Sequence, residues 1–290
     1  MNYLILATGQ GFKYGRRITK EIRLLGEKAY LYRCFSLDLA FRNHPEWNPN
    51  NLIIHSRAAN PNAEWMNRLV ELEEQEYRVV NNTSCLRTTS DKWASVRELR
   101  EIGNIPKTKL IQKSNFSFED IDDYFFTTWE SYPLVIKPRI SQGGGQFVFK
   151  LEENDLNGRE NFLSAINQVP GRYVIVQDYI EYDSLIRVFC INGRALPYGT
   201  IDTPTRNRWK VSVCLNKKQR GIRLNEELKL FAERIQQRIG GEINFIDIFD
   251  APNGLVLSEV NTACNLTIHE RLTGMNIAKK IAEYLVSLGG

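Results

Sequence analysis

The segment from Ile243 to Asn265 constrains the fold of this chain more than any other stretch of the sequence. Two apolar runs flank a Pro-Asn-Gly turn at residues 252–254, a pattern typical of a β-hairpin. If the turn centres on its asparagine, Asp247 lies opposite Glu259, and Asn261 shares their face because side chains alternate along a strand. The other face is apolar and is predicted to pack on the core: Ile246, Ile248, Val256 and Val260.

This hairpin would place two carboxylates directly across from each other, which is destabilising unless something neutralises them. A divalent cation would do so, and carboxylate and amide oxygens from Asp247, Glu259 and Asn261 suit Mg²⁺. A register slipped by one residue would instead leave two solvated acids on an exposed face. From these residues alone the two interpretations stand equal.

The second signal is a lysine in a predicted strand, followed by a glycine loop. Leu134 and Ile136 share one strand face, so Lys137 projects from the other. Three consecutive glycines then let backbone N–H groups approach an anion with no Cβ in the way. A tight hairpin explains the glycines equally well, and the spacing is not that of a Walker motif. Together with the lysine and the carboxylate hairpin, the loop indicates a site for phosphate and metal: Gln142, Gly143, Gly144 and Gly145.

The apolar strand Tyr173–Gln177 runs into a polar joint between two predicted units. Its backbone could offer hydrogen-bond groups to an adenine edge, and Asp178 or Asp183 could accept from ribose hydroxyls. A plain interdomain linker carries equal weight. The candidate adenine-binding residues are Gln177, Asp178, Tyr179 and Ile180.

Four basic residues are further candidates. Arg187 lies in an otherwise apolar strand and needs an anionic partner, either a ligand or a structural ion pair. Arg208 and Lys210 belong to a basic stretch that is either solvated or binds a substrate carboxylate or γ-phosphate. Lys92 opens a helix, where a cation is mildly unfavourable against the dipole, and this hints at a functional role.

Composition narrows the class of protein. With 290 residues, 42% of them hydrophobic and 25% charged, the chain is expected to form two or three small globular domains. Its net charge is only +4 and it has no basic block, so nucleic acid is not an expected partner. No apolar stretch is long enough to cross a bilayer, and the start of the sequence fits a first strand better than a signal peptide. Five scattered cysteines without metal spacing predict reduced thiols and a cytoplasmic protein.

The pattern of elements predicts a small parallel α/β domain followed by two α+β units. Strands and helices alternate up to about residue 89, and Ser90 or Asp91 can cap a helix that runs to about Ile102. The predicted domains are residues 1–89, 90–177 and 178–290. The expected strands are Tyr3–Leu6, Ala29–Arg33, Leu52–Ser56, Tyr77–Asn81, Leu134–Pro138, Gln146–Leu151, Tyr173–Gln177, Leu185–Ile191, Arg194–Ile201 and Trp209–Cys214. The expected helices, besides the one after Asp91, are Arg16–Leu25, Asn62–Glu76, Glu160–Asn167, Asn225–Ile239 and Met275–Leu288.

These motifs resemble the ATP-grasp superfamily over the whole chain. The pattern is most similar to the bacterial ribosomal-protein glutamate ligase and the amino-group-carrier ligases of lysine biosynthesis. The resemblance rests on D-x(11)-E-x-N at the hairpin, on the strand lysine before its glycine loop, and on Asp91-Lys92. It implies an N-terminal α/β domain followed by the two α+β subdomains of an ATP-grasp fold.

The resemblance also implies roles for the candidate residues. Asp247, Glu259 and Asn261 would bind two Mg²⁺ ions, with Mn²⁺ as the alternative metal. Lys92 and Lys137 would bind the phosphates of ATP, and adenine would lie at the joint from Gln177 to Ile180. Arg187, Arg208 and Lys210 would be catalytic residues, with Arg187 near the phosphates or an acylphosphate.

Two departures from the family pattern affect these roles. Two positions before Arg187 the family has an acidic residue, but this chain has Leu185. Ribose binding is therefore assigned to Asp183 or Asp178. The basic segment Arg208-Trp209-Lys210 continues with a valine where the family usually has an asparagine.

The implied function is an ADP-forming carboxylate–amine ligase that makes an amide or peptide bond through an acylphosphate. Its substrates would be small-molecule or peptide acids and amines, and a homo-oligomer is compatible with the family. The alternatives are a small-molecule kinase on the same fold and a non-catalytic ATP-binding regulatory protein.

Overall fold

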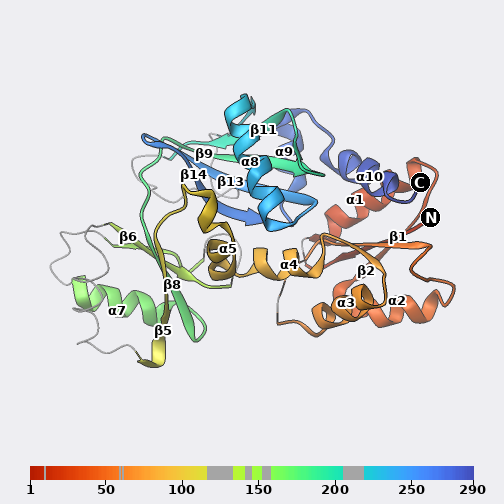
Figure 1. The fold of residues 1–290 in the computed structure, drawn as a ribbon, viewed down its shortest axis with the longest axis horizontal. Helices are drawn as coiled ribbons and strands as arrows, with labels where there is room; N and C mark the ends of the chain where they lie inside the picture. Colours follow the sequence, from red (N-terminus) through yellow and green to blue (C-terminus); the bar gives the residue numbers. More distant parts are fainter. Residues whose placement is uncertain are drawn as a thin grey trace.

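The computed structural model describes residues 1–9, 11–58, 60, 62–115, 133–140, 146–151, 158–204 and 219–290. Three sheets follow one another along the chain, one parallel and two antiparallel (Figure 1). The predicted combination of an α/β unit with α+β units is therefore confirmed. Among the described residues, no helix is both long enough and apolar enough to span a membrane.

The first sheet is parallel and has the strand order β2-β1-β3-β4. Its strands are β1 (Asn2–Ala7), β2 (Lys28–Arg33), β3 (Leu52–Ser56) and β4 (Arg78–Val80). Helix α1 (Gly11–Leu24) packs on one face, while α2 (Leu37–Asn43) and α3 (Glu64–Glu74) pack on the other (Figure 1). All four strands were predicted. The seven-residue α2, which follows a 3₁₀ turn at Cys34–Ser36, was not, because it is too short to show a clear helical period.

Two helices and a short turn lead to the second sheet: α4 (Thr83–Ser90), α5 (Lys92–Leu99) and the 3₁₀ turn Arg100–Ile102. The helix predicted after Ser90 or Asp91 is confirmed, and Asp91 is its N-cap. Helix α4 was missed because its sequence, TSCLRTTS, is rich in poor helix formers. It forms with Asn82 as its N-cap and with Cys85 and Leu86 buried.

The second sheet is antiparallel, with the strand order β5-β8-β6-β7. Its strands are β5 (Thr108–Gln112), β6 (Leu134–Pro138), β7 (Phe149–Leu151) and β8 (Tyr173–Asp178), and a 3₁₀ turn at Lys113–Asn115 follows β5. Helix α7 (Gly158–Gln168) packs on it (Figure 1). Strand β5 was not predicted, and β7 is shorter than the expected strand from Gln146. The predicted glycine loop lies outside the described residues.

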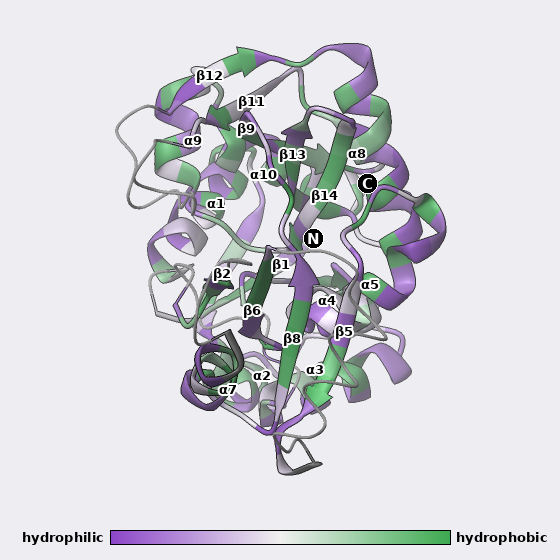
Figure 2. Cartoon of the chain, turned by 90° about the vertical axis from the view of Figure 1, so that its left-hand side faces the viewer, coloured by the Kyte–Doolittle hydropathy of each residue, from purple (hydrophilic) through white to green (hydrophobic). Residues whose placement is uncertain are grey.

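The third sheet has the order β12-β11-β9-β13-β14, with β10 paired to β9. Its strands are β9 (Ser184–Ile191), β10 (Arg194–Ala195), β11 (Tyr198–Asp202), β12 (Arg220–Arg223), β13 (Ile243–Ala251) and β14 (Gly254–Asn261). Helix α8 (Glu226–Ile239) covers one face, and α9 (Leu266–Thr273) and α10 (Ile277–Ser287) complete the chain. The helices carry both polar and apolar residues, as expected for helices that bury one face (Figure 2).

Three expectations about the third sheet need correction. The single strand expected at Arg194–Ile201 is two strands, separated by Leu196 and Pro197, because proline has no N–H to donate to the ladder. Strand β12 and helix α9 were not predicted. The strand expected at Trp209–Cys214 lies outside the described residues.

One hydrophobic core joins the first and third sheets. Tyr3 and Ile18 of the N-terminal unit are buried together with Phe189, Phe245 and Ile281 from the end of the chain. Helix α10 lies against α1, so the two chain ends are close in space (Figure 1).

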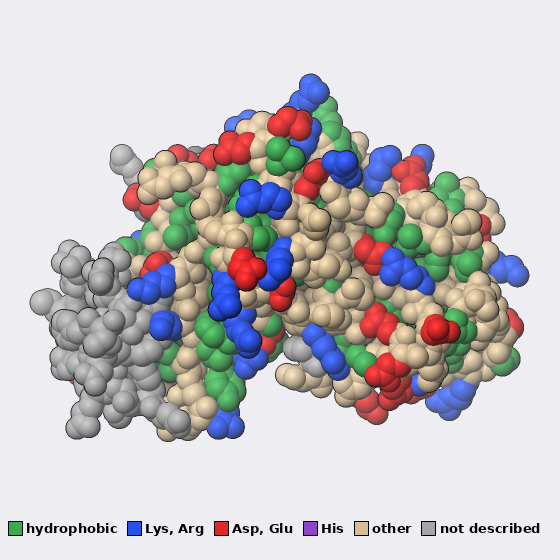
Figure 3. Space-filling view, in the orientation of Figure 1, with side chains coloured by type: hydrophobic (Ala, Val, Ile, Leu, Met, Phe, Trp, Pro, Cys, Tyr) green, Lys and Arg blue, Asp and Glu red, His purple; other side chains and the backbone are tan. Residues whose placement is uncertain are grey.

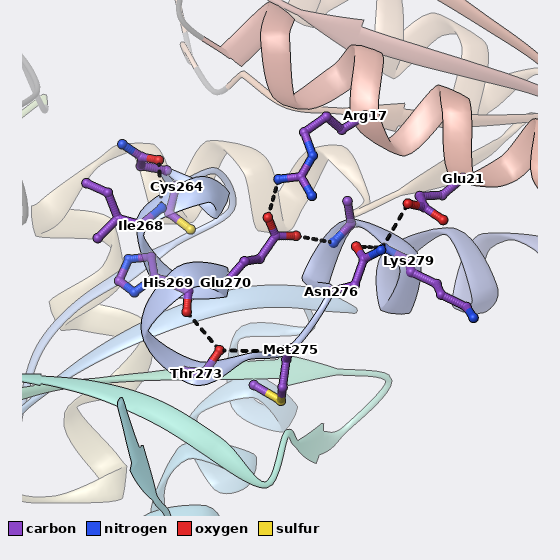
Figure 4. Close-up of polar contacts among 12 residues, drawn as sticks. Arg17, Glu21, Cys264, Ile268, His269, Glu270, Thr273, Met275, Asn276 and Lys279 are labelled. Atoms are coloured by element: carbon purple, nitrogen blue, oxygen red, sulfur yellow. Dashed lines mark hydrogen bonds and ion pairs between the residues drawn. The ribbon is translucent and has the colours of Figure 1, made fainter. Parts of the chain in front are cut away.

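Polar contacts reinforce this junction of α1 with α9 and α10 (Figure 4). Arg17 of α1 forms an ion pair with Glu270 of α9, and Glu270 also accepts from the backbone N–H of Ala278 at 3.0 Å. Asn276, the N-cap of α10, donates to Glu21 at 3.0 Å.

Candidate active site

The hairpin of β13 and β14 has the predicted pairing at its acidic residues. Asp247 pairs with Glu259, and Asn261 lies two residues further along the same strand, opposite Phe245. The turn, however, is tighter than expected, because Ala251 already pairs with Gly254. The register shifts by one residue beside Asp247, which leaves Ser258 as an extra residue in β14 and restores the predicted pairing.

This bulge corrects one expected core residue. Leu257, which pairs with Ile248, is buried in the core beneath α8, and Leu255 packs against that core. Val256 was expected there, but it pairs with Phe249 and is only half-buried. Ile246, Ile248 and Val260 are buried as predicted.

Each of the two facing carboxylates is neutralised by a basic side chain. Arg187, which pairs with Asp247 across β9 and β13, donates from two nitrogens to both carboxylate oxygens. Lys92 forms an ion pair with Glu259 at 3.1 Å. For Arg187 the sequence left open a bound ligand or a structural ion pair. The structure shows the ion pair, and the partner, Asp247, is one of the predicted metal ligands.

The two carboxyl groups differ electrostatically. Burial raises the pKa of Asp247 above its usual range, although Arg187 opposes the shift. Burial would also raise the pKa of Glu259, but the charges of Lys92, Lys137 and Arg187 together lower it. Glu259 therefore carries its negative charge in the middle of a basic cluster.

Lys137 projects from β6 into the same cluster. Leu134 and Ile136 are fully buried on the opposite face of that strand, as the alternation predicted. The Nζ of Lys137 donates to the Oε1 of Gln177 at 2.6 Å, and the amide nitrogen of Gln177 donates to Thr108 at 2.8 Å. Burial and the neighbouring Lys92 lower the pKa of Lys137 to about 8, against the attraction of Glu259.

Asp91 brings the two lysines together and was not among the predicted site residues. Its Oδ1 accepts from the backbone of Trp93 at 3.0 Å, and its Oδ2 accepts from Arg139 Nε at 2.8 Å. The backbone N–H of Lys92 in turn donates to the carbonyl of Arg139 at 3.0 Å. The start of α5 is thereby held beside the end of β6, where Lys137 lies. The sequence signalled it twice, as a helix cap and as part of the Asp91-Lys92 motif, but only Lys92 of that motif was assigned to the site.

His269 is a second residue that sequence reasoning did not place in the site. It is buried, its Nδ1 lies 2.7 Å from Thr200 Oγ1, and its Nε2 lies 3.3 Å from a guanidinium nitrogen of Arg187. Burial and the charge of Arg187 lower its pKa to about 3, so the ring is neutral. Since arginine can only donate, Nε2 accepts and Nδ1 carries the hydrogen. No local sequence pattern marks this residue, because its partners come from two other elements.

The predicted adenine joint is already engaged in hydrogen bonds. The N–H of Asp178 donates to the carbonyl of Lys107, and that of Tyr179 donates to Pro133, both at 3.0 Å. These two donors are therefore not free for a base in this structure. Burial raises the pKa of Asp178, with Lys107 opposing, whereas Asp183 is exposed. Arg208, Lys210 and Gln142–Gly145 lie outside the described residues.

A cavity lies between α5, the second sheet and the hairpin. Its polar lining includes Lys92, Lys137, Gln177 and Glu259. Its apolar lining is Val96, Leu99, Ile105, Pro106, Ile175, Leu257 and Val260. Basic and acidic side chains also gather around α5 on the face shown in Figure 3. An apolar cavity with two lysines at its polar side suits a ligand that joins an apolar group to an anion.

The donor set of the hairpin fits a magnesium ion. Among the described residues no group of three or more His, Cys, Asp or Glu could hold a metal, and the hairpin itself offers two carboxylates and the amide of Asn261. Mg²⁺ is commonly held by one or two carboxylates and completes its shell with water and substrate phosphates. The fold and the site are those expected of a protein that binds a phosphate-bearing ligand together with a cation.

Comparison with known proteins gives the family. The model of the RimK-like ATP-grasp domain matches residues 89–285. The alpha-aminoadipate–LysW ligase LysX of Sulfurisphaera tokodaii is 28% identical over 220 residues, which are 74% of this chain and 72% of that protein. A probable alpha-L-glutamate ligase of Mannheimia succiniciproducens is 25% identical over 224 residues, which are 75% of this chain and 70% of that protein.

A solved structure agrees with the fold. The ATP-grasp ligase PsnB, complexed with a phosphomimetic variant of its minimal precursor, Mg and ADP, has a TM-score of 0.69 and covers 99% of this chain and 98% of its own. Its sequence identity is 14%, so this likeness concerns the fold alone.

The chain therefore belongs to the RimK-like ATP-grasp family, as the sequence motifs indicated. It is an ATP-dependent ligase that forms a carbon–nitrogen bond with release of ADP.

Proposed function

We propose that the chain joins the carboxylate of an acidic amino acid to an amine through an acylphosphate. The observation that carries this proposal is the cluster of Lys92, Lys137 and Arg187 around the facing carboxylates of Asp247 and Glu259. ATP would phosphorylate the acid, and the amine would then displace phosphate to give an amide or peptide bond. Such reactions depend mostly on positioning and charge neutralisation.

The basic residues take separate roles in this proposal. Lys92 and Lys137 bind the phosphates, and Gln177 orients Lys137 through its 2.6 Å hydrogen bond. Arg187, held between Asp247 and His269, lies where it can stabilise the charge of the acylphosphate. A bound nucleotide would draw Lys92 away from Glu259, and Arg187 would likewise exchange part of its contact with Asp247.

The carboxylate face of the hairpin would hold the cation. Asp247, Glu259 and Asn261 are its ligands, and two Mg²⁺ ions, or Mn²⁺ in their place, would neutralise the phosphates between them. Adenine would lie in the apolar part of the cavity against Leu257 and Ile175, with the joint at Gln177–Ile180 beside it and Asp178 or Asp183 near the ribose. The glycine loop, Arg208 and Lys210 are proposed to cover the phosphates and the reacting carboxylate.

The substrate class follows from the relatives. One is named for alpha-aminoadipate and the carrier LysW, and another for L-glutamate, and both acids are amino dicarboxylic acids. We extend that class to this chain, with a small-molecule or peptide amine as the second substrate. We also propose that residues 1–89, 90–177 and 178–290 act as its three domains, that the protein is cytoplasmic, and that it assembles as a homo-oligomer.

An ADP-release screen tests the function. Acidic amino acids are combined with amino acids and peptides in the presence of Mg-ATP, and the products are identified by mass spectrometry. The proposal expects ADP release that requires both an acid and an amine, and a hydroxamate when hydroxylamine replaces the amine. A stable phosphoester without amide or hydroxamate would favour the kinase alternative. Nucleotide binding without turnover of any pair would favour a regulatory protein.

A further inference from the structure

Arg57, the residue directly after β3, is a buried guanidinium that has no carboxylate partner among the described residues. It is 2% exposed, and one terminal nitrogen donates to the carbonyl of Cys264 at 2.8 Å. Its Nε and its other terminal nitrogen are buried and have no hydrogen-bond partner among the described residues. A buried charge with unmet donors lowers stability, and the rings of Tyr14 and Phe245, 5.9 and 5.7 Å away, offset only part of that cost.

Tyr14 of α1 adds a third unmet donor at the same place. Its ring faces the guanidinium of Arg57, and its hydroxyl is buried without a partner among the described residues. Three donors from two side chains match the two oxygens of a carboxylate, which accepts up to four hydrogen bonds.

The nearby acid is already engaged. Glu270 uses one oxygen for Arg17 and the other for the N–H of Ala278 (Figure 4). Burial lowers the pKa of Arg57, against the electrostatic attraction of Cys264, Tyr14 and Glu270. The described part of the chain therefore supplies attraction to Arg57 but no acceptor for its two unmet donors.

Arg57 also lies beside the end of the hairpin of β13 and β14. Phe245, whose ring it faces, is directly opposite Asn261 and two residues from Asp247. Cys264, whose carbonyl it binds, follows three residues after Asn261. The guanidinium is thus next to the reaction centre, on the side of the N-terminal unit.

We propose that Arg57, assisted by Tyr14, binds a carboxylate that a substrate keeps throughout the reaction. This inference rests on the proposed function, in which the substrates include amino acids. The carboxylate belongs either to the acid, as its second carboxylate, or to the amine, if the amine is itself an amino acid. Because the donors are covered in the structure, binding requires a local opening beside Arg57.

The first test leaves the protein unchanged. L-Glutamate and its two monocarboxamides are compared as the acid, with Mg-ATP and hydroxylamine, because only the carboxamide that keeps the reacting carboxylate can be activated. L-Glutamate and its α-carboxamide are then compared as the amine, with the acid found in the screen. The carboxamide should react with a KM higher by about 10- to 100-fold in the arm in which Arg57 binds the carboxylate, because a charge-assisted hydrogen-bond pair is lost. Equal KM values in both arms would overturn the proposal.

Variants assign the effect to these side chains. Arg57→Met should raise the same KM to a similar extent and abolish the preference for carboxylate over carboxamide, while Arg57→Lys retains part of it. Tyr14→Phe, which removes one hydroxyl only, should raise the KM by about 2- to 10-fold. Arg68→Met is the matched control, because Arg68 pairs with Asp38 and Glu71 on the far helix α3.

Nucleotide binding separates the outcomes. All four variants should bind a non-hydrolysable ATP analogue like the parent protein. If Arg57→Met does not fold, Tyr14→Phe and the carboxamide comparison decide. A productive pair in which neither substrate retains a free carboxylate would overturn this inference and leave the ligase intact. A screen without any productive pair would refute the proposed function first.

Discussion

At the scale of single residues, the site consists of acidic and basic side chains that form ion pairs with one another. Asp247 is held by Arg187, and Glu259 by Lys92, with Lys137 close behind. Two facing carboxylates are costly in a hairpin, so the basic residues stabilise the fold as well as the proposed ligands. Nucleotide and cation can replace these internal partners without leaving any charge unpaired.

Replacement of Glu259 by glutamine tests the proposed metal site. The variant loses one negative charge while the side chain keeps its shape. The rate of ADP formation should fall by at least about 100-fold, which is the effect expected when one group that stabilises the transition state electrostatically is removed. The melting temperature should change little, because loss of this charge relieves the repulsion with Asp247 while it leaves Lys92 without its partner. Glu226→Gln, at an exposed ion pair with Lys229, is the control. Near-normal turnover by Glu259→Gln would contradict the assignment.

The lowered pKa of Lys137 predicts a pH dependence of nucleotide binding. A pKa of about 8 means that Lys137 is charged below pH 8 and loses its charge as the pH rises through that value. Affinity for the ATP analogue should therefore decrease above about pH 8, as titration calorimetry can show. Lys137→Arg, which stays charged, should remove that decrease, and Lys137→Ala should bind weakly at every pH. An unchanged affinity in Lys137→Ala would exclude this lysine from the phosphate site.

At the scale of elements, two small features orient the charged residues. The extra Ser258 in β14 turns Glu259 towards Asp247; without a bulge, the observed turn would pair Ser258 with Asp247 and point Glu259 to the core side. The cap at Asp91 sets the start of α5 against β6. Both features determine where Lys92 and Glu259 meet.

Loss of the cap should therefore affect both stability and nucleotide use. Asp91→Ala removes the acceptor of two backbone N–H groups and the partner of Arg139, and should lower the free energy of unfolding by about 1–2 kcal/mol. The KM for ATP should rise because Lys92 is no longer held in place. Asp91→Asn keeps an acceptor for the cap and should recover most of the stability but less of the KM. Urea unfolding and ADP-release kinetics check the two effects, and unchanged KM values would limit Asp91 to a structural role.

At the scale of the whole molecule, the end of the chain is part of the N-terminal unit's core. Helix α10 buries Ile277, Ile281 and Leu285 in the cluster that also contains Tyr3 and Ile18. The first and third sheets are thereby joined, and Arg57 of the first lies against the hairpin of the third.

The ion pair of Arg17 and Glu270 should contribute to this junction. Arg17→Met leaves Glu270, which is 10% exposed, without its charged partner, and should lower the free energy of unfolding by about 1–2 kcal/mol, since Arg17 itself is 39% exposed. Lys280→Met, at an exposed pair with Glu283, should change it by less than about 0.5 kcal/mol. Urea unfolding followed by circular dichroism compares them. Equal stability of the two variants would show that apolar packing alone holds the junction.

Sequence patterns predicted helices and strands well wherever buried and exposed residues alternate with a regular period. Strands β3 and β6 have the predicted ends, and the alternation around Lys137 is confirmed. The elements that were missed, such as α4 and β5, have no strong period or propensity and form because neighbouring elements bury them or cap their ends. The roles assigned to the site residues remain predictions.

The sequence by itself determined the family and the alternation of elements, because both depend on residue types at short or regular spacing. The predicted pairing of Asp247 with Glu259 is present, but it depends on the bulge at Ser258, which compensates for a turn tighter than expected. The tertiary structure alone decided which charge neutralises which. Arg187 meets both Asp247 and His269, and Arg57 meets Tyr14 and Phe245, only because distant segments are brought together by burial of a shared core. Hydrophobic burial is not directional, so no local sequence pattern predicts which distant residues become partners. The unmet hydrogen-bond donors of Arg57 can likewise be recognised only in the folded chain.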